Sequence, residues 1–194
     1  TLGLNLMKTQ VLGSGVVEVY GNMQFESSGG SALNSTTGLH QNIYSFHAGS
    51  RLIFDNGTPY SATANTERRW GDNVAIALRS SSVELIGDNS ASVANSETVG
   101  AVSFSGHGEM RASRSSGFSA ELVINGALTR IGLSTLTLNH TSGLLGIDAG
   151  GVNVERIKVV DMTGHIGANG MVNPYMMSRP QSQFLRYDPA LGFK

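Results

Sequence analysis

The stretch VAIALRSSSVELIG, residues 74–87, decides the fold class because its side chains alternate with a period of two. In its first half valine, isoleucine and leucine alternate with alanine, and after three serines Val83 and Leu85 alternate with Ser82 and Glu84. Apolar alternation over four to six residues is typical of a half-buried β-strand. The stretch therefore predicts two short strands in close succession, each with one face towards a core.

Similar bursts recur along the chain, and none keeps the helical spacing of i, i+3, i+4, i+7. The apolar pairs are Val17/Val19, Leu52/Phe54, Val102/Phe104, Leu122/Ile124 and Leu136/Leu138. Tight-turn sequences separate them, among them Asp55-Asn56-Gly57, Gly71-Asp72-Asn73, Gly87-Asp88-Asn89, Gly106-His107-Gly108 and Asn125-Gly126. From Val83 onward the strand pairs recur at roughly twenty residues, about one coil of a β-helix. The pattern predicts an all-β chain, either an elongated β-solenoid or a β-sandwich.

Composition excludes several classes of function. Charged residues make up only 14% of the chain, against about 25% in typical soluble domains, and the net charge is −1. Neither nucleic acid nor an anionic membrane surface is therefore expected as a partner. No apolar run approaches the roughly 20 residues that span a bilayer, so we expect no membrane insertion. The chain has no cysteine, which excludes disulfides and thiolate chemistry.

Two segments lack the regular alternation of short apolar strands and turns. Residues 22–44 are polar and rich in Gly, Ser and Thr, and we expect a long irregular loop within coils that otherwise occupy residues 1–170. Residues 171–194 hold three of the four prolines together with seven methionine or aromatic side chains. This tail is predicted to be extended, either as a cap on the stack or as a contact with a second subunit. Its candidate contact residues are Met171, Met176, Met177, Phe184, Tyr187 and Phe193.

Residues that could carry chemistry have simpler structural interpretations. Asp55, Asp72 and Asp88 each lie in a turn signature, where the carboxylate normally accepts a backbone hydrogen bond. Glu84 alternates outward and is expected on a solvated face. The five histidines show no i, i+4 or H-x-H pairing, so no metal site and no cofactor are predicted. Trp70, with Tyr60, Arg68 and Arg69 nearby, has two interpretations: a surface patch that binds sugars or a subunit, or a core residue at a coil corner.

Several of these segments resemble a known repeat. Gly13-Ser14-Gly15-Val16-Val17-Glu18-Val19-Tyr20-Gly21-Asn22, preceded by Leu6-Met7-Lys8, resembles the second half of the autotransporter-associated β-strand repeat, whereas Val11-Leu12 interrupts the first half. The order Arg69-Trp70-Gly71-Asp72, then Glu97–Gly106, then Phe184–Asp188, is similar to large verrucomicrobial and planctomycete surface proteins that carry such repeats. The resemblance implies a right-handed β-helix outside the cell and brings no catalytic residues.

These observations favour a structural role. We expect a non-enzymatic, extracellular or cell-surface β-solenoid that serves as a stalk or as a self-assembling fibre subunit. An adhesin or glycan-binding module, with Tyr60, Arg68, Arg69 and Trp70 as its contact patch, is the alternative. A polysaccharide-cleaving β-helix enzyme is the least favoured interpretation.

Overall fold

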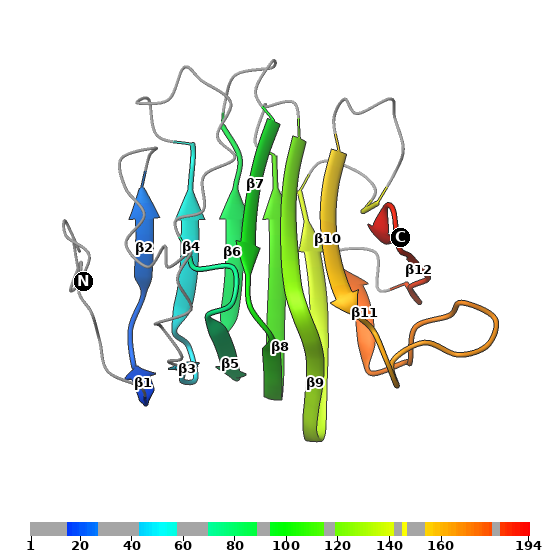
Figure 1. Cartoon of the computed structure of the whole chain (residues 1–194), viewed down its shortest axis with the longest axis horizontal. Coiled ribbons are helices and arrows are strands. Elements are labelled where there is room, and N and C mark those ends of the chain that lie inside the picture. The colour runs from blue at the N-terminus through cyan, green and yellow to red at the C-terminus, as the bar shows by residue number, and fades with distance from the viewer. Residues whose placement is uncertain are drawn as a thin grey trace.

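The computed structural model describes residues 15–26, 43–57, 70–88, 94–114, 119–141, 145–146, 154–179 and 183–194. These residues form strands and turns without a helix, and most strands pair in parallel with a strand one coil away. Figure 1 shows the strands side by side as rungs of one stack. The fold is a β-solenoid with three faces, and the parallel pairing excludes the antiparallel sandwich.

The first face, face A, stacks five rungs, the last two supplied by parts of longer strands. Its strands are β1 (Val16–Val19), β3 (Ile43–Phe46), β5 (Ala75–Arg79), the beginning of β8 (Val102–Ser113) and the middle of β9 (Ser119–His140). Their register aligns inward side chains into columns, one of which runs Val17, Tyr44, Ile76, Val102, Leu128. Alternation in each strand thus becomes a continuous apolar wall along the stack.

The second face, face B, follows face A in the first five rungs and has one further rung, β11. It consists of β2 (Met23–Glu26), β4 (Arg51–Asp55), β6 (Ser82–Ile86), the end of β8, the end of β9, and β11 (Met176–Arg179). One inward column runs Phe25, Phe54, Leu85, Ala112, His140. Face C is shorter and consists of β7 (Ala94–Val99), the beginning of β9, and β10 (Val154–Asp161).

The coil length differs from the sequence-based expectation of about twenty residues. Ile76 pairs with Val102, and Val102 pairs with Leu128, so the coils repeat every 26 residues at this position. Twenty residues is too short because each complete coil contains three strands rather than two. The alternation of apolar residues revealed the strands, but it did not reveal how many strands make up one coil of the solenoid.

One predicted loop contains a strand. β2 lies inside residues 22–44, which were expected to be irregular, and Phe25 packs its ring against Phe54 at 5.7 Å between centroids. The prediction is wrong there because pairing with β4 stabilises a four-residue strand whose own apolar pattern is weak. β3 likewise begins at Ile43, and residues 27–42 lie outside the described residues.

Trp70 belongs to the core and not to the surface. Its side chain is fully buried and packs edge-on against Tyr44, Phe25 and Phe54, with centroid distances of 4.8, 5.9 and 6.1 Å. The indole Nε1 donates to the Val74 carbonyl at 3.0 Å. Buried tryptophans commonly satisfy their N–H in this way. The surface-patch interpretation of Trp70 is therefore wrong.

The C-terminal tail covers the last coil. Leu185 and Phe193 are buried, and the Tyr187 hydroxyl accepts from the Val159 N–H in β10 at 2.8 Å. β12 (Tyr187–Asp188) and β13 (Gly192–Phe193) form a small antiparallel hairpin, in which the rings of Tyr187 and Phe193 lie 5.0 Å apart. An antiparallel hairpin cannot continue the parallel ladder, so it closes this end of the stack.

The tail residues named as subunit contacts divide by exposure. Met176 and Phe193 are fully buried within their own chain and are therefore not available to a partner. Met171 and Tyr187 are half-buried, whereas Met177 and Phe184 are 42% and 68% exposed and face each other across a β-bridge.

Candidate functional site

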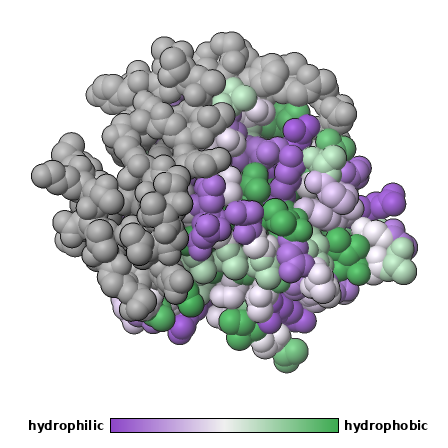
Figure 2. Space-filling model, in the orientation of Figure 1, coloured by the Kyte–Doolittle hydropathy of each residue, from purple (hydrophilic) through white to green (hydrophobic). Residues whose placement is uncertain are grey.

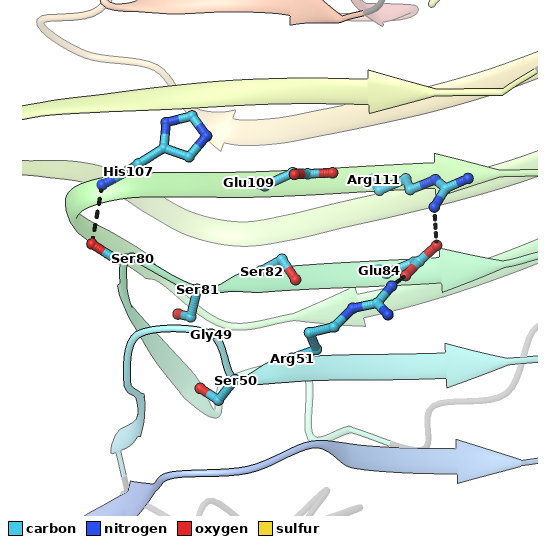
Figure 3. A pocket seen from close by; sticks show the side chains of 10 residues that line it. All are labelled: Gly49, Ser50, Arg51, Ser80, Ser81, Ser82, Glu84, His107, Glu109 and Arg111. Carbon is cyan, nitrogen blue, oxygen red and sulfur yellow. Dashed lines mark hydrogen bonds and ion pairs between the residues drawn. The ribbon is translucent and has the colours of Figure 1, made fainter.

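A hollow among the described residues lies where face A turns into face B. We call it the corner pocket. It has a volume of about 310 Å³ and is lined by the turns that precede β4 and β6 and by outward side chains of β4, β6 and β8 (Figure 3). Residues from three successive coils thus meet at one place, because the register puts Arg51, Ser82 and Glu109 in one outward column.

A buried ion-pair cluster forms the inner side of this pocket. The Glu84 side chain is only 4% exposed, and each of its oxygens meets an arginine: Oε1 lies 2.8 Å from Arg111 Nη1, and Oε2 contacts Arg51 Nη2. Arg51 comes from the preceding coil and Arg111 from the following one, so the cluster joins three rungs (Figure 3). The expectation that Glu84 is solvated is wrong: it does point outward, but guanidinium groups on both sides cover it.

Glu109 and His107 occupy the next coil. A Glu109 oxygen accepts from the Asn139 amide at 2.9 Å, and His107 Nδ1 lies 3.0 Å from the Thr135 hydroxyl. These contacts hold both side chains at the rim. They leave the pocket with carboxylate acceptors, guanidinium donors and an imidazole within one small volume.

The serines of the pocket serve mainly to build the corner. Ser50 donates to the His47 carbonyl at 2.5 Å, and Ser81 donates to the Phe46 carbonyl at 2.9 Å. Since both hydroxyls donate their hydrogen bond to a backbone carbonyl, these serines stabilise the turns and are not oriented as nucleophiles. The pocket thus offers polar recognition, and the contacts of its serines and histidine do not form a Ser–His relay.

Corner geometry shapes the rim as well. Ser80 has a φ of 56°, the only positive value for a non-glycine among the described residues. Its neighbour one coil on, Gly106, has a φ of 67°, and a Cβ added there would lie 2.3 Å from Ser80 Oγ. Ser80 therefore fits only because the next coil carries glycine at that corner.

The predicted chemical residues are dispersed. The Asp55 carboxylate accepts from the Gly57 N–H at 2.8 Å, as expected of a turn residue. Asp72 lies in the turn before β5, whereas Asp88 lies just after β6 and is buried. Tyr60, Arg68 and Arg69 lie outside the described residues. Across the described part of the chain, no three His, Cys, Asp or Glu side chains are grouped so that they could hold a metal ion.

A second buried carboxylate lies near the C-terminal end. Glu155 accepts from the N–H groups of Arg114 and Thr141, each at 3.0 Å, and lies 3.7 Å from Nδ1 of the buried His140. Glu155 belongs to face C, Thr141 follows face B, and Arg114 is one coil earlier. The Glu155 side chain therefore connects the backbone after face B in two successive coils, which is a structural role.

Sequence reasoning missed the corner pocket because its members are far apart along the chain. Arg51, Glu84 and Arg111 are each separated by about one coil, and only the correct register reveals them as neighbours. The available signal was an isolated charge on the outward side of three alternating strands, but the strands align at unequal spacings: Ile53 pairs with Glu84, and Glu84 pairs with Arg111.

The described residues contain no helix long and apolar enough to cross a membrane. No family model, no curated protein and no solved structure matches this chain. The resemblance to autotransporter-associated repeats therefore stays a prediction, and what is established for the protein is a β-solenoid fold.

Proposed function

We propose that the protein is a structural β-solenoid module of an extracellular bacterial surface protein, acting as the closed end of a stalk. The observation that carries the proposal is a stack of parallel strands on three faces around one continuous core, which ends under an antiparallel hairpin. Every inner rung is hydrogen-bonded to both neighbours, so the stack gains stiffness along its axis without needing a ligand. The absence of cysteine is compatible with such a role, because the ladder supplies the cross-links that disulfides give small secreted domains.

The two ends of the stack differ in how their strands are covered. This difference indicates which end would contact another copy of the module. Residues 183–194 of the tail cover β10 and β11, whereas β1 and β2 pair on one side only among the described residues. Gly15 and Val19 use their carbonyls for β3, so the backbone groups of Val16 and Glu18 point to the opposite side. An edge of this kind can accept another strand. Self-association of the module would therefore use the β1 edge and not the capped end.

Surface composition fits a solvated stalk. On the visible face in Figure 2, polar and apolar side chains of the described residues are interspersed. Outward ion pairs such as Lys158–Glu121, at 2.9 Å, lie on face C. The glycan-binding alternative is less supported because Trp70 is buried and cannot contact a sugar. The enzyme alternative is less supported because the Asp55 carboxylate accepts a hydrogen bond within its own turn.

The assembly part of the proposal is tested by size-exclusion chromatography with light scattering and by negative-stain imaging over a range of concentrations. We expect association that grows with concentration. Val16→Pro removes the N–H on the side of β1 opposite β3 and should abolish association, while Val16→Thr, which keeps the N–H, should not. A wild-type chain that stays monomeric throughout, or a Val16→Pro variant that associates normally, would rule out assembly through β1.

A further inference from the structure

We propose that the corner pocket is a binding site for one neutral sugar unit, a function independent of the stalk and of assembly through β1. The pocket lies on the outer surface of face B, and its volume of about 310 Å³ is at the lower end of the roughly 300–1,000 Å³ of small-molecule sites. A ligand of one ring is therefore the appropriate size.

Charge balance selects a neutral ligand. The pocket contains two arginines, Arg51 and Arg111, and two glutamates, Glu84 and Glu109. Both guanidinium groups are turned to the Glu84 carboxylate (Figure 3), so neither is left as an uncompensated positive charge for a phosphate or a sulfate. An anionic ligand would have to break this cluster, and separating a buried ion pair is costly.

The remaining hydrogen-bonding groups suit hydroxyls. Arg51 and Arg111 keep 44% and 30% of their side chains exposed, and a guanidinium has five N–H donors, more than Glu84 uses. Glu109 and the Ser82 hydroxyl lie in the same outward column as Arg51 and add acceptors. A sugar hydroxyl both donates and accepts, so neighbouring hydroxyls can bridge a carboxylate and a guanidinium.

The lining also argues against a nucleotide. It contains no phenylalanine, tyrosine or tryptophan on which a base could stack, and it offers no excess positive charge for a phosphate. The apolar part of the lining is instead supplied in part by the aliphatic stems of long side chains, which are suited to the C–H face of a small ring.

Backbone strain at the rim is a separate observation that points to the same place. Ser80 holds the left-handed conformation that glycine adopts more easily, and it lines the pocket. Strained residues of this kind persist where surrounding structure enforces them and are concentrated at functional sites. Serine at this position places a hydroxyl at the rim, where its oxygen already meets the His107 N–H at 3.4 Å.

The test is an NMR titration of the full chain, following backbone amides, with glucose, N-acetylglucosamine and galacturonate as probes. We expect saturable shifts with a neutral sugar, with a dissociation constant on the order of millimolar. The shifts should be confined to residues 49–51, 80–82 and 107–111, and galacturonate should bind more weakly. Saturation by none of the three sugars, saturation by galacturonate alone, or shifts centred elsewhere would each overturn the assignment.

Two variants locate the site. Ser82→Leu fills the pocket and should weaken binding at least about tenfold. Ser103→Leu, at a half-buried outward position of face A, is the matched control and should bind as the wild type does. If Ser82→Leu does not fold, Glu109→Gln removes one acceptor charge and should also weaken binding. Unchanged affinity in the folded pocket variants would overturn the proposal.

Discussion

Replacing Glu84 by glutamine should lower the free energy of unfolding by about 2 kcal/mol. Breaking a buried ion pair by removing one partner costs roughly 3–5 kcal/mol, since the other charge is left without compensation. Here the Glu84 side chain is 4% exposed, but Arg51 and Arg111 are 44% and 30% exposed, so water can partly solvate the guanidinium groups. Their solvation reduces the expected loss to the smaller value.

Glu121→Gln is the matched control, because Glu121 also has two cationic partners on an outward strand position. Its carboxylate lies 2.9 Å from Lys158 Nζ and 3.6 Å from Arg156 Nη1, but the side chain is 26% exposed. Surface ion pairs contribute about 0–1 kcal/mol. The same substitution should therefore cost less here, although the number of partners is equal.

The assay is equilibrium unfolding in urea, followed by the emission of Trp70. This is the single tryptophan of the chain and is fully buried, so its emission should shift to longer wavelength when the core opens. A loss below about 0.5 kcal/mol for Glu84→Gln, the size typical of surface substitutions, would show that Glu84 is solvated and refute the cluster. An equal loss in Glu121→Gln would refute the argument from burial.

Three further outcomes are expected. Phe193→Ala should cost about 3–5 kcal/mol because the ring is fully buried in the cap, whereas Phe184→Ala, at a side chain 68% exposed, should cost under about 0.5 kcal/mol; urea unfolding distinguishes them. Gly100→Ala should cost about 1–3 kcal/mol by the same assay, since its Cβ would lie 2.6 Å from a backbone carbon of the neighbouring coil, while Gly21→Ala meets nothing within 4 Å and should be near neutral. The pKa of Asp188 is lowered, first by the Lys194 side chain and then by two backbone N–H groups, so its stabilising effect is present above the unfolded-state pKa and disappears as the pH falls through the folded-state pKa. Thermal unfolding across acid pH should show this loss in the wild type and not in Asp188→Asn; parallel curves would contradict it.

The strands were predictable because their cause is local. Alternation in residues 74–87 requires one face in a core and one outside, and β5 and β6 lie where the pattern put them. Asp55 as a turn residue was equally local, since its carboxylate binds an N–H two residues away. The same locality explains the failure at β2, which depends on its partner β4 more than on its own four residues.

By itself, the sequence determined an all-β chain of short strands with glycine-rich corners, and the resemblance to a known repeat favoured a solenoid. Only the tertiary structure decided the contents of each coil, the burial of Trp70 and Glu84, and the position of the corner pocket. The physical reason is that alternation specifies on which side of a strand a residue lies, but not what faces it from the next coil. For Glu84 the difference is between water and two guanidinium groups, and the register of β6 with β4 and β8 makes that choice.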